Sequence, residues 1–418
     1  MQSLTPERLN DCPADVCDAR APEVSIRELT PPDRPAIHRF YDTSPISPSG
    51  RYVAVTRMPT DTRPPEPGEV AYVDLVDLED GSIVPVAQTR AWDMQLGAQV
   101  QWGATDRDLL FNDMVFEQGV PVPAGVRLDP FSGQTQRLAG TVYMAHPAGT
   151  HVASPCLRRI GLTQPGYGVA IHPSHLPHLD PVADDDGVFV TDLATGECRL
   201  VCSIRRIVDE CRLDPAGGTF HGFHVKYNPQ GDRLMFVLRW LDARGTKQWR
   251  SWCITLRVDG SEPRVALDAD RWAVGGHHPN FTPDGRRILM NLRPGPDQPL
   301  RFVTFNLDGS DFRVLSERII ASGHPTLHPD GRHLLTDAYL KDAAAFGDGT
   351  TPLRWIDLHT EQEATLARVR TQPHDAPVDR DHGVLRVDPH PAWDRDFKRF
   401  VFNACPTGVR QVFLATLS

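Results

Sequence analysis

One short stretch decides the fold: Phe281-Thr282-Pro283-Asp284-Gly285-Arg286-Arg287-Ile288-Leu289. Proline fixes φ, the polar residue and glycine form a tight turn, and the following apolar residues suit a strand, so the stretch predicts a β-hairpin. Clear copies occur at 46–55, 227–236 and 327–335, and weaker copies at 102–106, 145–149 and 393–397. A second strand-and-turn unit alternates with these copies, for example at 188–196 and 302–309. The alternation predicts an all-β fold, a seven-bladed β-propeller with four short antiparallel strands in each blade.

The two ends of the chain complete this prediction. The last unit ends with the strand-like residues 412–417 and lacks one strand, whereas residues 23–29 read as a strand near the N-terminus. We expect that strand to complete the last blade and close the ring, which removes exposed sheet edges. Residues 1–22 are then an N-terminal extension, and residues 23–418 form a single propeller domain. The longest interruption, at 157–186, predicts a long loop in the third blade.

Composition excludes several classes of protein. The 418 residues carry a formal net charge of -10 at pH 7, spread along the chain, and a binder of nucleic acid or of an anionic membrane would show a basic face. No apolar run has the length of a membrane span, and the N-terminal residues do not read as a secretory signal. The 8 cysteines are scattered and predict reduced thiols. These features predict a cytoplasmic protein that is a monomer or a weak homo-oligomer.

The repeats place histidines in phase. With the copies aligned on their turns, the position five residues before the turn proline is occupied in order by Thr43, Gln99, Val142, His224, His278, His324 and His390. In a propeller this position lies near the start of the innermost strand, at the mouth of the central channel. Histidines that converge there form a metal site or an acid–base site. The alternative is that His-Pro is simply a good dipeptide for entering a strand, because a residue before proline favours the β region.

One carboxylate strengthens the metal interpretation. Asp388 lies two residues before His390, and on one strand both side chains would face the same way. The pair predicts a two-ligand arm, to which His324 of the adjoining blade adds a third ligand. The expected metal site is therefore His324, Asp388 and His390.

The last three blades resemble a known family. The segments 276–285, 323–325, 388–393 and 408–414 resemble the oligogalacturonate lyases, which are seven-bladed propellers that cleave oligouronides by β-elimination. The resemblance is detailed over about 270–418 and architectural before that. Propeller ulvan lyases and rhamnose-glucuronate lyases are related groups to which this chain is also similar.

The resemblance implies roles for the histidines. His278 takes the place of the family's proton-abstracting base, and His324 and His390 match ligands of its manganese ion. The chain departs from the family at Asp388, where the family has histidine, and at Leu385, where it has glutamine. An aspartate can ligate Mn²⁺ or Ca²⁺, whereas a leucine cannot, so the cofactor is Mn²⁺ or Ca²⁺, or there is none.

β-Elimination from a uronate needs a base and a cation. The base removes the proton next to the carboxylate, and a metal ion or an arginine neutralises that carboxylate. Arg239, in the fourth blade just after the inner strand, is one candidate cation, and Arg386 is the alternative because arginine suits planar carboxylates. His224 is a further candidate catalytic residue on the phased position.

The loop of the third blade offers two more candidates. Tyr167 and His172 are either part of a lid that contacts the sugar and protonates the leaving group, or incidental residues of a solvated loop. His146, in the third copy of the turn, is a further candidate for binding the substrate. The segment 38–43, which leads into the first inner strand, is a weaker candidate for lining the same mouth.

Two other functions are known for propellers with such repeats. A non-catalytic TolB-like propeller, acting as a binding scaffold, explains the repeats but has no use for phased histidines. The propeller half of a prolyl-oligopeptidase-type hydrolase is excluded because the chain has no Gly-x-Ser-x-Gly motif. The residues do not specify the uronate, the linkage, the exo or endo mode, or the metal ion.

Overall fold

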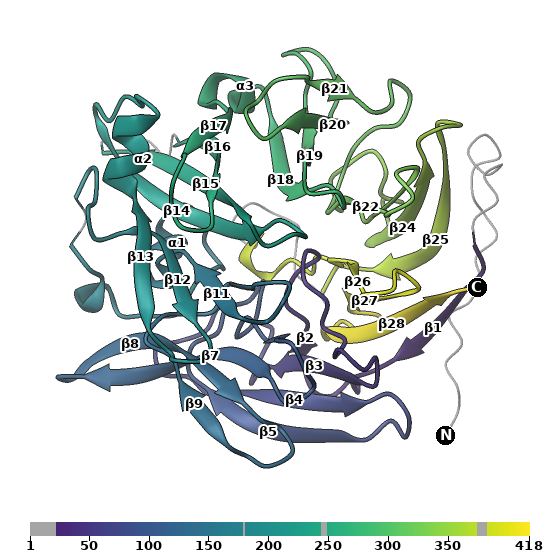
Figure 1. Ribbon diagram of the computed structural model, residues 1–418. Coiled ribbons are helices and arrows are strands. Elements are labelled where there is room, and N and C mark those ends of the chain that lie inside the picture. Colours follow the sequence, from purple (N-terminus) through teal and green to yellow (C-terminus); the bar gives the residue numbers. More distant parts are fainter. Residues whose placement is uncertain (1–21, 179, 244–248, 374–382) are drawn as a thin grey trace.

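The computed structural model describes residues 22–178, 180–243, 249–373 and 383–418, and it confirms the seven-bladed propeller (Figure 1). Each blade is a four-stranded antiparallel sheet, and within the first six blades the strands are adjacent in the order in which the chain makes them. Short turns join neighbouring strands, which is why a local hairpin pattern was sufficient to predict the architecture.

The strands of the first three blades are β2 (Ala36–Ile37), β3 (Tyr52–Arg57), β4 (Ala71–Asp77), β5 (Ile83–Thr89), β6 (Gln101–Trp102), β7 (Leu109–Glu117), β8 (Val120–Leu128), β9 (Thr135–Arg137), β10 (Met144–Ala145), β11 (His151–Ser154), β12 (Gly187–Asp192) and β13 (Cys198–Ser203). The next three blades contain β14 (Gly218–Tyr227), β15 (Arg233–Asp242), β16 (Trp249–Arg257), β17 (Arg264–Leu267), β18 (Gly276–Phe281), β19 (Arg287–Leu292), β20 (Arg301–Asn306), β21 (Arg313–Val314), β22 (Thr326–Leu327), β23 (His333–Thr336), β24 (Thr350–Asp357) and β25 (Gln362–Arg370). The seventh blade combines β26 (Ala392–Trp393), β27 (Arg399–Ala404), β28 (Gln411–Leu417) and β1 (Val24–Glu28).

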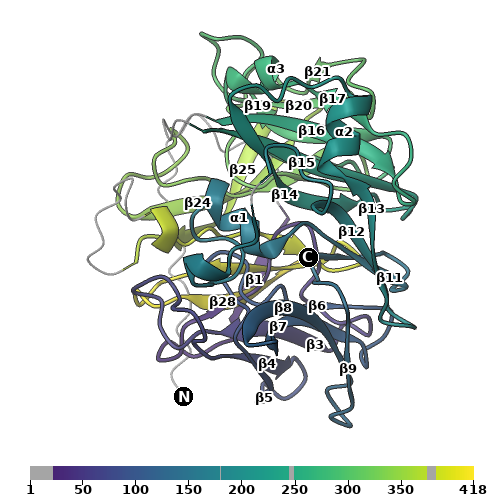
Figure 2. The same cartoon turned by 90° about the vertical axis from the view of Figure 1, so that its left-hand side faces the viewer.

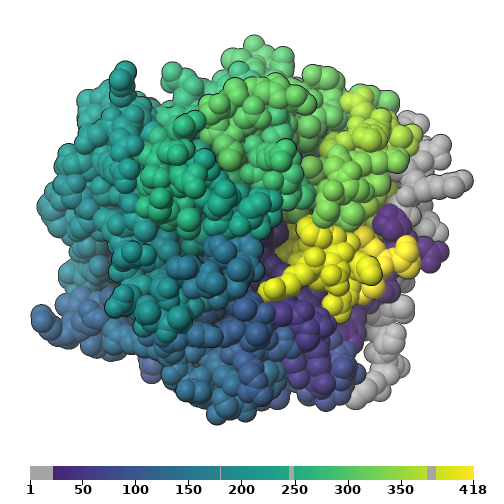
Figure 3. Space-filling view, in the orientation of Figure 1, coloured from purple at the N-terminus to yellow at the C-terminus, as the bar shows by residue number. Residues whose placement is uncertain are grey.

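The N-terminal strand closes the ring, as the sequence predicts. Strand β1 pairs antiparallel with β28, with Val24 opposite Leu417 and Glu28 opposite Phe413. In the space-filling view the yellow last blade packs directly against the purple first blade (Figure 3). Apart from Pro22, the expected N-terminal extension lies outside the described residues.

The turn that defines the repeat has the expected geometry. Gly285 has a φ of 66°, in the left-handed region that favours glycine. Its N–H donates to the carbonyl of Thr282 at 2.8 Å, which closes the turn. A Cβ on Gly285 would lie 1.8 Å from Oε1 of Gln230 in the neighbouring blade. Glycine is therefore required both for the turn and for the close approach of two blades.

The core lies between the blades. Met235 and Cys253 of the fourth blade and Ile288 and Met290 of the fifth share one apolar cluster, and all four side chains are fully buried. Because blades stack face to face, both faces of a sheet are covered, and the second strands of the blades carry nearly continuous apolar runs, as in β3, β19 and β27. Burying one such isoleucine or methionine side chain stabilises the folded state by about 1.5–3 kcal/mol.

Helices are few and lie outside the sheets: α1 (Leu157–Thr163), α2 (Ile204–Glu210), α3 (Ala269–Ala273) and the 3-10 turns η1 (Pro173–His175) and η2 (Gly383–Leu385). Helix α1 and the segment carrying η2 project on the same side of the ring (Figure 2). None of the helices in the described part of the chain has the length and apolar character that a membrane crossing requires.

The interruption predicted at 157–186 does separate β11 from β12, but it is more ordered than a solvated loop. It forms α1 and η1, and Tyr167 within it is only 6% exposed. The described cysteines are all free, in agreement with the predicted reduced thiols.

Candidate active site

The phased positions meet at the centre of the ring. The ring centroids of His278 and His324 are 3.9 Å apart, and those of His324 and His390 are 4.2 Å apart. Phe40, from the first blade, contacts the rings of all four phased histidines, including His224 at 5.4 Å. The four residues, which are up to 166 positions apart in the chain, therefore form one cluster.

Irregular backbone aims these side chains. The pairing of β18 with β19 shifts register between His277 and Asn280, so His278 lies in a bulge, and it has a φ of 59°. His390 has a φ of 49° and precedes β26. Bulges re-aim side chains next to functional sites, and a left-handed residue interrupts the alternation of a strand. The expectation that Asp388 and His390 share one strand is wrong: both precede β26, and the backbone bend at His390 brings their side chains together.

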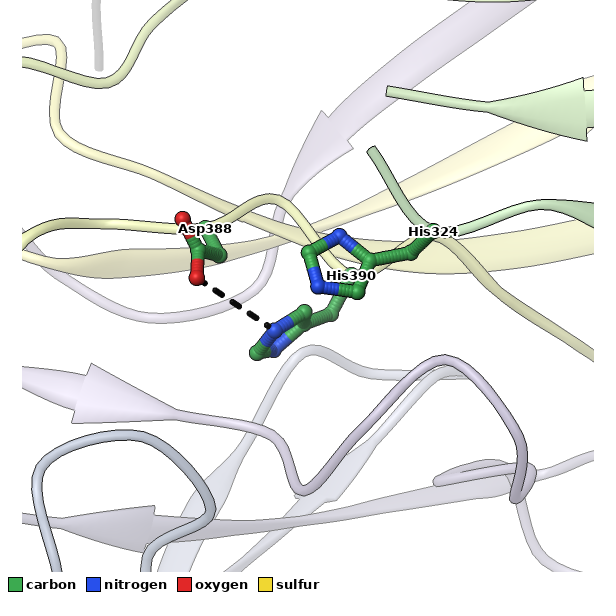
Figure 4. Close-up of side chains that lie close together, drawn as sticks. All are labelled: His324, Asp388 and His390. Atoms are coloured by element: carbon green, nitrogen blue, oxygen red, sulfur yellow. Dashed lines mark ion pairs between the residues drawn. The ribbon is translucent and has the colours of Figure 1, made fainter. Parts of the chain in front are cut away.

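His324, Asp388 and His390 converge as a possible metal site (Figure 4). Their donor atoms all lie within 4.8 Å of one another, and Oδ2 of Asp388 is 3.8 Å from Nε2 of His390. Nε2 of His324 and both ring nitrogens of His390 are buried, and none of them has a hydrogen-bond partner within the described part of the chain. Buried polar atoms are normally paired, so these free nitrogens fit the donor set of a divalent cation.

Asp337 orients two of these residues. Nδ1–H of His324 donates to both carboxylate oxygens of Asp337 at 3.0 Å, which leaves Nε2 with its lone pair. The backbone N–H groups of His324 and His390 donate to the same carboxylate, at 2.6 and 3.2 Å. Burial alone would raise the pKa of Asp337, but the neighbouring His324 and these hydrogen bonds lower it overall.

A cavity of about 450 Å³ opens beside the histidines, which is within the range of small-molecule sites. Three arginines, three histidines and five aromatic residues are on its wall: Arg239, Arg250, Arg386, His224, His277, His278, Tyr167, Phe223, Trp249, Trp272 and Tyr339. No described residue on the wall carries a carboxylate. The cavity therefore suits an anionic ligand that also offers apolar faces.

His278 presents a basic nitrogen to this cavity. Its Nδ1–H donates to the carbonyl of Gly323 at 2.7 Å, and its Nε2 lies 3.2 Å from the hydroxyl of Tyr339. Because a carbonyl only accepts, the proton of the neutral ring is on Nδ1 and the lone pair is on Nε2. Burial, with the neighbouring His324, holds the pKa of His278 well below its usual value. The side chain is therefore neutral, with the lone pair of Nε2 available as an acceptor.

Two of the cavity arginines are the predicted cations. Arg386 donates from Nε to Asp388 at 2.7 Å and from Nη2 to the Tyr167 hydroxyl at 3.1 Å. Arg239 donates to the Thr163 carbonyl at 3.1 Å and to the side chain of Gln164 at 2.8 Å, and no carboxylate among the described residues pairs with it. Burial lowers the pKa of Arg239 to about 10, so it remains charged at neutral pH. Arg239 lies within β15, the second strand of its blade, rather than just after the inner strand.

The structure does not bring every predicted residue to the cavity. Tyr167 and His224 line it, and Tyr143 hydrogen-bonds Nδ1 of His224. His172 is exposed on the third-blade loop, away from the cavity wall. His146 lies in the turn between β10 and β11, where its Nε2 contacts the Gly231 carbonyl at 3.1 Å. That turn is at the opposite end of the inner strand from the phased positions. His146 therefore does not lie on the side of the ring where the phased histidines meet.

Several residues at the site escaped the sequence interpretation. The segment 38–43, to which we gave little weight, fills the centre of the ring: Phe40 is fully buried, and the Tyr41 hydroxyl donates to the His278 carbonyl at 3.1 Å. Asp337 and Tyr339 were not identified at all.

A signal for Asp337 was present in the repeats. The position six residues after the turn is occupied by Thr56, Asn112, Pro155, Val237, Asn291, Asp337 and Asn403. Where this residue is polar, it binds the backbone of a following blade, as Asn112 does with Val142 and Asn403 with His38. Asp337 is the member of this series that carries a carboxylate. Tyr339 lies outside the repeat, and no pattern marks it.

Comparisons with known proteins agree with the fold. No family model and no curated protein matches the chain. An oligogalacturonate lyase solved in complex with manganese has a TM-score of 0.60 and 16% identity, over 97% of this chain and 96% of that one. An oligogalacturonate lyase from Vibrio parahaemolyticus has a TM-score of 0.60 and 14% identity, over 95% of this chain and 98% of that one.

A propeller of another kind is also similar. The β-propeller domain of the Trilobed protease from Pyrococcus furiosus has a TM-score of 0.50 and 10% identity, over 90% of this chain and 95% of that domain. At these identities the likeness concerns the fold, which the chain shares with oligogalacturonate lyases over nearly its whole length. Function must be argued from the site.

Proposed function

We propose that this protein is a lyase that cleaves uronic-acid-containing oligosaccharides by β-elimination. The observation that supports it most strongly is that His278, whose ring proton is on Nδ1, lines the same cavity as Arg239 and Arg386. The chemistry requires this combination, because the proton next to a carboxylate is only weakly acidic until a cation stabilises the negative charge that develops. The shared fold with oligogalacturonate lyases supports the same reaction.

Each residue has a distinct task in this mechanism. His278 removes the C5 proton of the uronate through Nε2, and Arg386 and Arg239 bind its carboxylate. Tyr167 and Asp388 orient Arg386 by accepting its hydrogen bonds. A positioned donor to a developing negative charge is worth about 2.7–4 kcal/mol of transition-state stabilisation. His224 lines the same cavity and completes its polar wall.

The same proposal includes a metal ion held by His324, Asp388 and His390. Two imidazoles and one carboxylate favour Mn²⁺ over Ca²⁺, which takes oxygen ligands. When bound, the ion would supply positive charge that helps to neutralise the substrate carboxylate. The three residues are almost fully buried and do not line the cavity, whereas Arg386 does and contacts Asp388 directly. We therefore assign the contact with the substrate carboxylate to the arginines.

The test is the ultraviolet absorbance of the C4–C5 unsaturated product. Oligomers of galacturonate, glucuronate and rhamnose, ulvan and alginate would each be incubated with the protein, with added Mn²⁺, with added Ca²⁺ or with EDTA. We expect a rise in absorbance with at least one substrate, and a slower rise after EDTA. Folded protein that produces no rise with any substrate would contradict the lyase and favour a binding scaffold.

A further inference from the structure

Tyr339 contacts the proposed base directly. Its hydroxyl lies 3.2 Å from Nε2 of His278, and both side chains are half-buried on the cavity wall. Since Nδ1 of His278 carries the ring proton, Nε2 is the acceptor and the hydroxyl of Tyr339 is the donor. A proton donor and a proton acceptor therefore stand side by side, on one side of the space that a substrate would occupy.

This arrangement constrains the stereochemistry of an elimination. β-Elimination from a uronide breaks the C5–H bond and the C4–O4 bond. A base and an acid each work within about 3 Å of the atom that they serve. If hydrogen and oxygen leave from opposite faces of the sugar, the ring lies between the two groups and holds them about 6 Å apart. If both leave from the same face, the groups can be neighbours, as Tyr339 and His278 are.

We infer that Tyr339 is the proton donor to the leaving oxygen, and that the substrate is a uronide whose C5 hydrogen and C4 oxygen lie on the same face of the ring. This inference rests on the proposed β-elimination. D-Glucuronate and D-mannuronate residues have this configuration. D-Galacturonate differs at C4 and L-guluronate differs at C5, and in both the two groups lie on opposite faces.

Every proton that moves in this step passes between the substrate, His278 and Tyr339. Nε2 of His278 takes the C5 proton, the electron pair of the C5–H bond forms the C4–C5 double bond, and the C4–O4 bond breaks. The leaving oxygen takes the proton of the Tyr339 hydroxyl. The proton now on Nε2 of His278 then passes across the contact to the Tyr339 oxygen, which restores both residues. No further reactant is required.

The other tyrosine of the cavity serves as a comparison. The Tyr167 hydroxyl accepts from Arg386 at 3.1 Å, which places it beside the residue that binds the carboxylate. Tyr339 is the cavity tyrosine whose hydroxyl hydrogen-bonds His278. A Tyr339→Phe substitution removes the donor without changing the ring, and Tyr167→Phe is the matched variant.

The first experiment compares epimeric substrates with the unaltered protein. Oligoglucuronate is paired with oligogalacturonate, and oligomannuronate with oligoguluronate, and kcat/KM is measured from product absorbance. We expect the same-face member of at least one pair to be preferred by about 100-fold or more, the contribution of a positioned acid. Equal rates, or preference for oligogalacturonate or oligoguluronate, would overturn this inference and leave the lyase intact. No elimination with any of the four would overturn this inference, and the lyase as well if the ulvan and glucuronate–rhamnose oligomers also gave no product.

The second experiment isolates the acid. Tyr339→Phe should lower kcat by about 100-fold with little change in KM, and a uronide carrying a nitrophenoxy group at C4 should restore most of that loss, because this leaving group needs no proton. Tyr167→Phe should show no such dependence on the leaving group. An equal loss on both substrates in folded Tyr339→Phe protein would show that Tyr339 is not the acid.

Discussion

The phased position divides the ring into two halves with different tasks. In the first three blades it holds Thr43, Gln99 and Val142, and in the last four it holds histidines. Thr43 and Gln99 accept hydrogen bonds from the buried Arg39, with Oε1 of Gln99 at 2.9 Å, and Val142 packs in an apolar cluster. The first half therefore uses equivalent backbone places to fill the centre, whereas the second uses them to present imidazole nitrogens.

The halves also differ in how buried charge is balanced. Asp42 of the first half pairs with Arg39 at 2.5 Å and, across the centre of the ring, with Lys226 of the fourth blade at 2.9 Å, and all three side chains are at most 1% exposed. In the second half Nε2 of His324 and both ring nitrogens of His390 have no hydrogen-bond partner among the described residues. The comparison shows that a repeat supplies equivalent positions, while the side chains decide whether each position stabilises the fold or performs chemistry.

The sharpest test removes the base from the histidine half. His278→Gln should lower kcat for uronide elimination by about 10³-fold, because glutamine cannot accept the C5 proton. The matched change in the other half is Val142→Ala, which should cost about 2 kcal/mol of unfolding free energy but leave kcat per folded molecule unchanged. Product absorbance and urea denaturation measure the two effects. A folded, active His278→Gln protein would contradict the catalytic role that we give to the second half.

The second prediction concerns the charges of the first half. Asp42→Asn leaves Arg39 and Lys226 buried without a counter-charge and should lower the free energy of unfolding by about 3–5 kcal/mol. The control is Arg51→Met, because Arg51 pairs with Asp77 at the surface with its side chain 41% exposed. That change should cost about 0–1 kcal/mol. Urea denaturation of both variants makes the comparison, and equal losses would contradict it.

The third prediction concerns the metal site. Asp337→Asn should weaken Mn²⁺ binding by about 10–100-fold, because the carboxylate fixes the tautomer and orientation of His324. Asp394→Asn alters a carboxylate in the seventh-blade turn, where it accepts from Arg399, and should leave the affinity unchanged. Isothermal titration calorimetry measures both variants. Unchanged affinity in Asp337→Asn protein would contradict the prediction that His324, held by Asp337, is a ligand of the Mn²⁺ ion.

The smallest expected effect is on the pH dependence of stability, and it concerns a buried histidine that is not in the phased series. His221 is buried at 1% exposure outside the phased series, and burial with the nearby Arg159 lowers its pKa to about 4. The unfolded chain binds this proton near pH 6.5 and the folded chain does not, so stability falls as the pH drops from 6.5 towards 4. His221→Gln should flatten that fall by about 1.4 kcal/mol per pH unit. Denaturation between about pH 4 and 7 measures the slope, and an unchanged slope in His221→Gln protein would contradict the prediction.

Much of the site follows from local patterns. The turn at 281–289 and its copies predict the blades, because a hairpin depends on a few consecutive residues. Counting from those turns places His278, His324 and His390 at equivalent positions, and the structure brings them together. Asp337 occupies another equivalent position of the repeat, six residues after the turn, where the other blades carry threonine, asparagine, proline or valine. His146 is in the turn itself, at the other end of its strand, and it does not line the cavity.

The sequence by itself therefore determined the propeller, the strand that closes it and the cluster of histidines, because each depends on residues close together or on a constant repeat. Only the tertiary structure decided what surrounds the cluster. The contact of Tyr339 with His278 spans 61 residues, and that of Tyr41 with the same residue spans 237. Bulges and left-handed residues direct these side chains, and such departures from regular strands arise when blades pack around one centre. The acid beside the base is thus a product of packing that no local pattern encodes.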